Sequence, residues 1–337
     1  MISLVVPVYR SAAGIPDLLE AVDGLARAVE EPFEAVFVVD GSPDDSLLLL
    51  GRDLPNRRFD SQLLSLSRNF GAFSAIRAGL EAAQGEVVVV MSADLQEPPE
   101  LVLELANKLR SGEWDVAVGQ SIGRADTSLS SNLFWWMYRR FVIPEIPSGG
   151  ADIFGCTRAV RDQILQMNEG NSSLIGLLFW VGFRWCLVPY ERQARPKGSS
   201  AWTLGKKLTY LNDSVFSFSD LPIRLLTRAG LFGLAVSIVF SCVVLAWGLS
   251  GPTPVPGYAA TVLVVTFFGA LNLFGLGVIG SYVWRSFENT KVRPQYIVQA
   301  RAEFHPQESS GDDARGTNEE GNERDGSERE GNEREGN

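Results

Sequence analysis

Asp94 is the residue whose position in the chain first suggests chemistry. It follows the run Val87 to Met91, which is apolar without polar alternation, as expected for a central strand of a parallel sheet covered on both faces. Such a strand delivers Asp94 to the carboxyl edge of the sheet, where open α/β sheets bind their ligands. A carboxylate there suits a divalent cation that bridges a diphosphate. The alternative is that Asp94 only caps the helix expected from Glu97 to Arg110, which would hold two prolines in its first turn.

A second carboxylate closes a second apolar run. Asp40 ends the segment Glu34 to Asp40 (EAVFVVD) at the place where Asp94 follows its own strand. Two carboxylates at one sheet edge are what a nucleotide and its metal need, one to meet the base or ribose and one to hold the cation. In the same motif, DGSPDD, Asp44 and Asp45 are better explained as turn and helix-capping residues.

Three cations stand close together in the sequence YERQARPKGSSAW, namely Arg192, Arg195 and Lys197. The Gly and Pro residues of this loop would let it wrap a phosphate, which an Arg guanidinium can bind through two parallel hydrogen bonds. A phosphate monoester has a second pKa of about 6, so at neutral pH it is largely a dianion and needs cations more than a base. A solvated surface or a lipid-headgroup patch is the alternative explanation for this cluster.

The histidine and cysteine residues of this chain are too few or too poorly spaced for several common kinds of site. The single histidine, His305, stands where the tail begins, so a histidine base or catalytic triad is not expected. A reaction at an already ionised phosphate would not need such a base, whereas activation of a hydroxyl would. The cysteines, Cys156, Cys186 and Cys242, have no metal-ligand spacing, so neither a zinc site nor a disulfide framework is expected. No nucleic-acid partner is expected either.

The first 110 residues alternate between strand and helix patterns. A βαβα alternation of this kind predicts an α/β fold with a mostly parallel sheet and helices on both faces. After Trp114 to Gly119 the regular pattern stops. The expected strands are Ile2 to Tyr9, Glu34 to Asp40, Leu63 to Ser67 and Val87 to Met91, and the expected helices are Ile15 to Val29, Ser46 to Asp53, Phe73 to Ala83 and Glu97 to Arg110.

One segment concentrates the apolar residues. The 45% hydrophobic content and mean hydropathy of +0.05 are high for a soluble protein, and Ala229 to Trp284 contains no Asp, Glu, Lys, Arg or His. This segment is long enough for two membrane helices, 229–250 and 258–284, separated by a Pro- and Gly-rich turn. Arginines and lysines precede and follow it, so the positive-inside rule predicts that the N-terminal domain and both termini are cytoplasmic.

The remaining boundaries follow from charge and composition. Residues 308–337 contain 11 acidic residues and 4 Arg and no aliphatic residue larger than alanine, which predicts a disordered acidic tail. Because Ile2 to Val8 is already strand-like, no signal peptide is expected. Leu129 to Ile143, rich in Trp and Arg, suits a helix in the headgroup region, with buried core as the alternative. The expected domains are 1–203 catalytic, 204–228 interfacial helices, 229–250 and 258–284 membrane helices, 285–304 a juxtamembrane segment and 305–337 the tail.

A set of motifs in order along the chain resembles a known family. The set comprises VVPVY (5–9), VDGS (39–42), SRNFGAFSAIRAGL (67–80), SADLQEPPE (92–100) and GFR…VPYERQARPKGSSAW (182–202), followed by two membrane helices. It resembles the family-2 glycosyltransferases that load a sugar onto a polyprenyl phosphate, and the resemblance covers about residues 2 to 290. It implies a GT-A type, Rossmann-like fold. It also implies a nucleotide-diphosphate sugar donor, Mg²⁺ or Mn²⁺, and inversion of the anomeric carbon in one displacement, giving a lipid-linked monosaccharide for cell-envelope glycan or glycoprotein synthesis.

The resemblance also assigns roles to individual residues. It implies that Asp40 contacts the nucleotide, that Asp94, helped by Gln96, holds the metal, and that Asp152 faces the reacting centre near the acceptor. A turn at the end of a strand is the alternative for Asp152. The other residues implied are Pro7, Tyr9, Ser67 and Asn69 for the nucleotide sugar, and Arg192, Arg195, Lys197 and Ser199 for the acceptor phosphate.

The chain departs from the family pattern at three positions. Family members usually carry paired acids where this chain has Val39 and Ser92, and an Arg where it has Phe154. Mg²⁺ commonly uses one or two protein carboxylates together with phosphates and water, so one missing acid weakens the site without abolishing it. Ser92 can offer an oxygen in its place, although a poor one.

Two alternative functions stay open at this point. One is a family-2 enzyme with another lipid or glycan acceptor, although the Q-x-x-R-W signature of processive members is absent after Gln193. The other is a non-catalytic nucleotide-sugar binder, favoured by Val39 and Ser92. The sequence specifies neither the sugar, the nucleotide nor the polyprenyl lipid, and it leaves open whether the protein forms a homo-oligomer.

Overall fold

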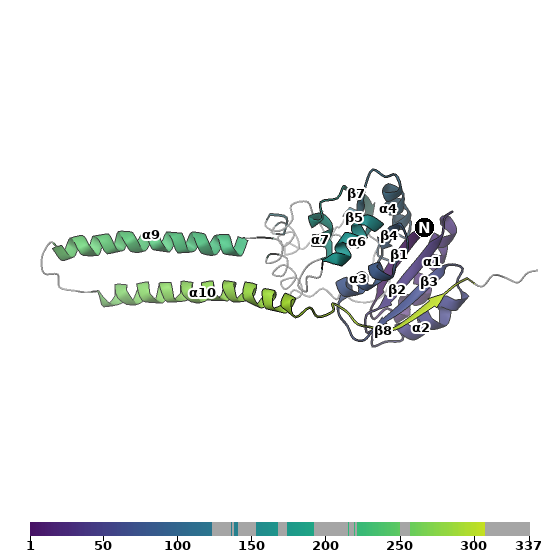
Figure 1. Ribbon diagram of the computed structural model, residues 1–337, viewed down its shortest axis with the longest axis horizontal. Coiled ribbons are helices and arrows are strands. Elements are labelled where there is room, and N and C mark those ends of the chain that lie inside the picture. Colours follow the sequence, from purple (N-terminus) through teal and green to yellow (C-terminus); the bar gives the residue numbers. More distant parts are fainter. Residues whose placement is uncertain are drawn as a thin grey trace, which may run out of the picture. The chain divides into compact units, whose positions relative to one another are not determined.

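The computed structural model describes residues 1–122, 138–140, 153–167, 174–191, 221–249 and 257–306, with single positions at Trp136, Val215 and Ser219. Within these residues eight strands form one mixed sheet in the order β7-β5-β6-β4-β1-β2-β3-β8 (Figure 1). The strands are β1 (Ile2–Val8), β2 (Phe33–Val39), β3 (Asp60–Leu66), β4 (Val87–Val90), β5 (Val116–Ile122), β6 (Phe154–Thr157), β7 (Trp185–Glu191) and β8 (Val298–Phe304).

The helices of the sheet domain lie close to the ranges expected from the sequence. They are α1 (Ile15–Ala28), α2 (Ser46–Asp53), α3 (Ala72–Ala82), α4 (Glu100–Arg110), α6 (Arg158–Gln166) and α7 (Leu174–Trp180). The largest difference is at α4, which was expected from Glu97 and begins three residues later. A residue that precedes proline is disfavoured in the α conformation, and Glu97 and Pro98 both precede one. The regular helix therefore starts after the second proline.

The centre of the sheet is parallel, as predicted. Strand β1 pairs with β2 on one side and with β4 on the other, with Val8 opposite Val39 and Val5 opposite Val90. The carboxyl ends of β1, β2 and β4 therefore meet at one edge. The chain order 3-2-1-4 reverses direction at β1, which makes the gap between β1 and β4 a topological switch point, the usual ligand site of such sheets.

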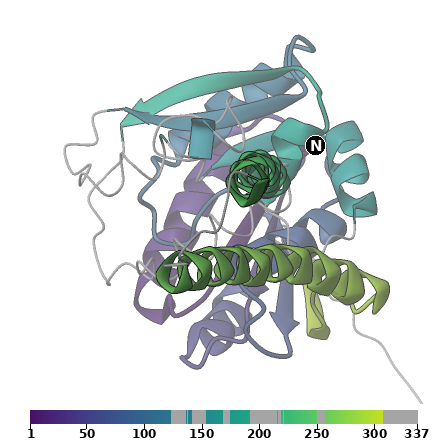
Figure 2. The same cartoon turned by 90° about the vertical axis from the view of Figure 1, so that its left-hand side faces the viewer.

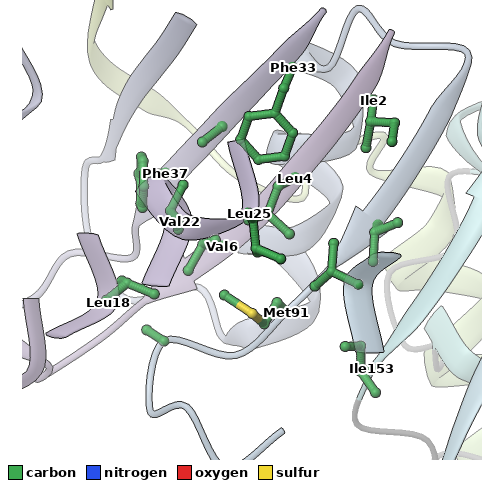
Figure 3. Packing of buried hydrophobic residues seen from close by; sticks show 14 of the residues in the cluster. Ile2, Leu4, Val6, Leu18, Val22, Leu25, Phe33, Phe37, Met91 and Ile153 are labelled. Carbon is green, nitrogen blue, oxygen red and sulfur yellow. The ribbon is translucent and has the colours of Figure 1, made fainter. Parts of the chain in front are cut away.

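Both faces of the sheet are covered, which explains the apolar character of β1. Leu4 and Val6 pack in a cluster with Leu18, Val22 and Leu25 of α1 (Figure 3). Val5, on the opposite face, belongs to a second cluster with residues of α3, α6 and α7. Each such side chain, fully buried, contributes on the order of 1.5–3 kcal/mol. Helices α1, α2 and α4 thus cover one face, and α3, α6 and α7 the other.

The chain after β5 remains regular, contrary to the expectation that the pattern stops after Gly119. Strand β6 lies antiparallel between β4 and β5. Strand β7 runs parallel to β5, beside it in Figure 2. Strand β7 ends at Glu191, the last residue described before the basic loop. The sheet therefore leads directly into the segment predicted to bind the acceptor phosphate.

Strand β8 was not predicted. It pairs antiparallel with β3, with Leu63 opposite Ala302 (yellow in Figure 1). Sequence analysis assigned residues 285–304 to a juxtamembrane segment, although Val298, Ala300, Ala302 and Phe304 alternate with polar residues, a period typical of a half-buried strand. Ala302 and Phe304 pack against the first core cluster. The segment after the apolar helices thus completes the sheet.

Two long helices follow β7 and precede β8 in the sequence. They are α9 (Leu221–Leu249) and α10 (Tyr258–Thr290). Many of their large apolar side chains are exposed, among them Phe232 of α9 and Leu273 of α10. Among the described residues, Phe267–Thr290 is the segment whose length and mean hydropathy of 1.5 would allow it to cross a membrane. The second membrane helix expected from the sequence stays a prediction.

Candidate active site

The residues predicted for the nucleotide sugar gather at the carboxyl edge of the sheet. Pro7 lies within β1, and Tyr9 follows that strand with 40% of its surface exposed. Asp40 follows β2 directly, and Ser67 follows β3. Asp94 lies four residues beyond the end of β4. The parallel pairing of these strands places all five positions at one edge, as predicted from the sequence.

Asp40 organises the neighbouring loop. Its carboxylate is buried, with 2% of the residue exposed. One oxygen accepts a 2.7 Å hydrogen bond from the main-chain N–H of Phe70, and the other a 2.8 Å bond from that of Gly71. These donors immediately precede α3, so the negative charge also lies at the positive end of a helix. Each oxygen can accept one further hydrogen bond, which a nucleotide could supply. The contact of Asp40 with a nucleotide stays a prediction.

Gly41 lets two loops touch. Its φ of +54° lies in the left-handed region, and a Cβ atom there would approach the carbonyl carbon of Arg68 to 2.3 Å and the nitrogen of Asn69 to 2.5 Å. A side chain cannot be accommodated against main chain at that distance. The turn after β2 therefore fixes the loop in which Ser67 and Asn69 are exposed. The guanidinium of Arg68 lies 4.0 Å from the ring centre of Phe70 in the same loop.

Asp44 fastens two further loops together, which confirms its expected turn role. Its carboxylate accepts hydrogen bonds from the main-chain N–H of Ala12 at 3.0 Å and from the hydroxyls of Ser42 at 2.6 Å and Ser46 at 2.7 Å. Burial raises the pKa of this carboxyl, but the hydrogen bonds from Ser42, Ala12 and Ser46 outweigh it and lower the pKa to about 2. The loops after β1 and β2 are thus joined through an ionised group.

Arg10 and Arg68 are two exposed cations at this edge that sequence analysis did not select. Arg10 has a φ of 53°, which is uncommon for a residue with a side chain. Its main-chain N–H donates a 2.8 Å hydrogen bond to Ser42, and its guanidinium lies 5.4 Å from the ring centre of Tyr9. The signal available in the sequence was an arginine placed directly after a strand end, in the motif VPVYR.

Asp94 lies in a tight loop with Ser92 and Gln96. The hydroxyl of Ser92 lies 2.8 Å from Oδ1 of Asp94, and the main-chain N–H of Gln96 donates a 3.3 Å hydrogen bond to the same oxygen. Leu95 between them has a φ of 51°, so the chain turns back sharply. Such conformations cost free energy and are found preferentially at ligand sites. Gly14, which immediately precedes α1, lies alongside, since a Cβ there would be 3.9 Å from the carbonyl oxygen of Ala93.

The donor atoms in this loop fit a hard divalent cation. The carboxylate of Asp94, the hydroxyl of Ser92 and the side-chain amide of Gln96 offer oxygen, which Mg²⁺ and Mn²⁺ prefer. Within the described part of the chain there is no cluster of three or more His, Cys, Asp or Glu side chains that could hold a metal by themselves. The loop therefore fits a cation that takes most of its ligands from diphosphate and water.

The predicted acceptor residues lie outside the described residues. This holds for Asp152 and for Arg192, Arg195, Lys197 and Ser199. The chain next to Asp152 is fixed, because Ile153 is buried and its carbonyl accepts a 3.0 Å hydrogen bond from Gly119. Phe154, which replaces the family's arginine, is a core residue of β6 with 1% exposed.

A pocket of about 380 Å³ lies between the start of α4 and the end of β7. Glutamates contribute much of its polar lining, which makes it unsuited to a phosphate without a cation. It begins at Pro98, a few residues beyond Asp94, so it borders the edge described above. Its lining residues are Pro98, Glu100, Leu101, Glu104, Pro189, Tyr190 and Glu191.

Comparison with known proteins places the chain in a family. Residues 3–167 match the model of glycosyl transferase family 2. The protein CsbB of Bacillus subtilis (strain 168), named as a glycosyltransferase, is 33% identical over 89% of this chain and 91% of its own length. Two bactoprenol glucosyl transferases are also similar. That of Shigella phage SfV is 31% identical over 88% of this chain and 98% of that protein, and that of Shigella phage SfX is 30% identical over 89% and 99%.

Solved structures are similar to the chain at a lower level. Glucosyl-3-phosphoglycerate synthase from Mycobacterium tuberculosis, in complex with Mn²⁺ and UDP-glucose, has a TM-score of 0.47 and 19% identity over 64% of this chain and 79% of that chain. The relatives, in contrast, match along nearly their whole lengths at 30% identity or more. On that ground the chain belongs to glycosyltransferase family 2 and is a glycosyltransferase.

Proposed function

We propose that this glycosyltransferase transfers a sugar from a nucleotide-diphosphate sugar to a membrane polyprenyl phosphate, with inversion at the anomeric carbon. The observation that carries the proposal is the match to proteins named bactoprenol glucosyl transferase, which spans 99% of the relative from Shigella phage SfX. The match extends over the sheet and the two long helices together. Shared length of this kind supports a shared acceptor class.

The sheet edge supports the donor half of the reaction. The switch point between β1 and β4 is where a nucleotide diphosphate binds in open α/β sheets. Asp40 shapes the loop of Ser67 and Asn69 on one side, and Asp94 and Gln96 stand on the other. A Mg²⁺ or Mn²⁺ ion held by Asp94 would neutralise charge on the leaving diphosphate. Arg10 and Arg68, exposed at the same edge, would add positive charge near it.

The acceptor phosphate needs to be oriented and its charge neutralised, and it does not need a general base. A phosphate oxygen of the acceptor attacks the anomeric carbon as the bond from that carbon to the diphosphate breaks, so one displacement inverts the centre. The acceptor is already ionised at neutral pH, and no proton has to be removed. We assign the cations for this phosphate to Arg192, Arg195 and Lys197, with the Ser199 hydroxyl, and a place near the reacting centre to Asp152.

The apolar helices support a membrane location. The exposed apolar surface of α9 and α10 suits lipid. Cationic residues flank the pair, and by the positive-inside rule they favour a cytoplasmic location for both ends. They are Arg224 and Arg228 near the start of α9, Arg285 in the last turns of α10, and Lys291 and Arg293 beyond it. A polyprenyl phosphate presents its head group at that same surface. The membrane-spanning role of both helices is part of the proposal.

The test is transfer of label in membranes that contain the full chain. With a panel of labelled nucleotide sugars, one should deliver label to an organic-extractable, acid-labile product, and chelation of divalent metal should stop the transfer. Arg195→Ala should lower this rate more than it weakens nucleotide binding, because its proposed partner is the acceptor. Transfer of label only to hydroxyl acceptors would overturn the polyprenyl-phosphate assignment and favour another family-2 acceptor.

A further inference from the structure

Ser92 stands between two carboxylates. Its hydroxyl lies 2.8 Å from Oδ1 of Asp94 and also contacts Oε2 of Glu97. Glu97 is fully buried, with 0% of its surface exposed, whereas Asp94 is partly exposed. The sequence pattern predicts Glu97 only as a residue of the first turn of a helix. The structure instead turns its side chain back onto the loop that is predicted to hold the metal.

The local backbone explains how Glu97 reaches this position. The left-handed φ of 51° at Leu95 reverses the chain between Asp94 and Gln96. Pro98 and Pro99 then keep Glu97 out of α4, which begins only at Glu100. Glu97 is therefore held beside Ser92 by the turn before it and the prolines after it.

A serine hydroxyl has one proton and can donate it to one carboxylate at a time. The Ser92 hydroxyl lies within hydrogen-bonding reach of both carboxylates and is the donor in each contact. When a cation binds beside Asp94, the hydroxyl proton can turn to Glu97. The lone pairs of the Ser92 oxygen are then free to face Asp94 and whatever lies beside it.

The spacing of the two facing oxygens matches neighbouring ligands of one cation. Oxygens that bind an octahedral Mg²⁺ at 2.0–2.1 Å stand about 2.8–3.0 Å apart at right angles. The separation between Ser92 Oγ and Asp94 Oδ1 is 2.8 Å. Without a cation this distance suits a hydrogen bond from the Ser92 hydroxyl to Asp94, and a cation bound to both oxygens would take the place of that hydrogen bond.

We propose that Ser92 and Glu97 together replace the acid that the family usually carries at position 92. Ser92 provides the ligand oxygen, and Glu97 provides the negative charge by accepting the hydroxyl proton of Ser92 in a hydrogen bond. Glu97 is thus a positioning residue for the cation, acting through Ser92. The inference rests on the proposed function, because it requires that Asp94 holds a divalent cation.

The test measures binding of Mn²⁺ alone to the full chain in detergent, followed by the paramagnetic resonance signal of the free ion. Asp94→Asn should weaken binding strongly, which tests the site itself. Glu97→Gln should weaken binding by about 10- to 100-fold, as loss of a partner that supports a metal ligand does. Glu113→Gln removes an exposed charge beyond the end of α4 and serves as the control, with a change of less than about threefold.

The decisive variant moves the charge to the ligand position. Ser92→Asp combined with Glu97→Gln keeps the net charge and lets the new amide donate a hydrogen bond to the new carboxylate. Its affinity for Mn²⁺ should return to within about threefold of the original chain, a rescue that a merely structural role of Glu97 would not give. Thermal unfolding of each variant identifies any that does not fold, and Ser92→Ala then replaces Glu97→Gln with the same expected loss.

The outcomes separate this inference from the proposed function. If Asp94→Asn binds Mn²⁺ as tightly as the original chain, the metal site of the proposed function is wrong. If Asp94→Asn loses affinity while Glu97→Gln and Ser92→Ala keep it, the site stands and the role of Glu97 is overturned. Failure of the double variant to regain affinity, with the protein folded, also overturns it.

Discussion

The main-chain N–H of Ser67 donates a 3.0 Å hydrogen bond to the carbonyl oxygen of Ile297. A residue predicted to contact the nucleotide sugar is thereby tied to the segment that follows α10. Next to it the hydroxyl of Tyr296 donates to Glu81 on α3, and Arg301 of β8 donates a 2.8 Å bond to the side chain of Gln62. The segment from Tyr296 to Phe304 is therefore part of the sheet domain.

This connection predicts that two C-terminal truncations behave differently. Ending the chain after Pro306 removes only residues outside the described sheet domain, and turnover and unfolding temperature should stay almost unchanged. Ending it after Gln295 removes Tyr296, Ile297 and β8, exposes the edge of β3 and takes away the carbonyl that accepts the hydrogen bond from Ser67. We expect a fall in unfolding temperature of about 5 °C or more and weaker donor binding. Equal unfolding temperatures for the two truncations would contradict the role of β8.

Two glycine substitutions should have opposite effects. Gly41→Ala places a methyl group 2.3 Å from the main chain of Arg68 and forces a left-handed φ on alanine, so it should destabilise the fold by about 2 kcal/mol or more and weaken donor binding. Gly24→Ala, in α1 with nothing within 4 Å of the new methyl group, should stabilise by about 0.5–1 kcal/mol. Urea unfolding of both variants measures the difference. A neutral Gly41→Ala would mean that the loops do not touch.

Asp40→Asn tests whether the carboxylate shapes the donor site. The amide can accept from one main-chain N–H, but its NH₂ group faces the other, so Phe70 or Gly71 loses its acceptor. We expect a loss of stability of about 1–3 kcal/mol and a raised KM for the donor sugar with a smaller change in KM for the lipid. An equal rise in both KM values would argue against a specific effect on the loop of residues 67–71.

The ionised state of Asp44 gives a dependence of stability on pH. Its folded pKa of about 2 lies below the ordinary value of 3.8. This carboxylate therefore stabilises the fold fully above about pH 4 and loses that contribution as the pH falls toward 2. Asp44→Asn should be less stable than the original chain at pH 7, and the gap should narrow between pH 4 and pH 2. A gap that stays constant over this range would show that ionisation of Asp44 is not involved.

The proposed topology can be tested by labelling from outside intact cells. In a background with Cys242 replaced by Ser, a cysteine at Thr253 should react with an impermeant reagent, whereas one at Asn56 should not. Asn56 lies in the sheet domain, in the short 3₁₀ helix Leu54–Asn56. Labelling at Asn56 with protection at Thr253 would reverse the assignment.

The parts of the fold that local patterns determine were predictable from the sequence. Apolar runs gave β1, β2 and β4, and the shared edge of Asp40 and Asp94 follows from parallel pairing. Strand β8 was missed because its partner, β3, is far away in the chain, and a local pattern does not identify a partner. Its alternation of apolar and polar residues was nevertheless visible.

The contacts within the site were less predictable than its location. The turn at Leu95 depends on a left-handed φ at a leucine, which local propensity opposes. Without that turn Glu97 reads as the first residue of a helix and Ser92 as an isolated substitution. The engagement of the Asp40 carboxylate by Phe70 and Gly71 likewise joins segments that are distant in the sequence.

Strand β8 is made after both apolar helices, and this fixes when the sheet can be completed during synthesis. β3 ends at Leu66 and β8 at Phe304, and both apolar helices are made between them. At about 5–20 residues per second a ribosome needs roughly 12–50 s for this interval, during which the hydrogen-bonding edge of β3 has no partner. The nascent domain therefore completes its sheet only after the apolar helices have left the ribosome. An insertion machinery that delays those helices would lengthen the time in which the open edge can pair with another nascent chain.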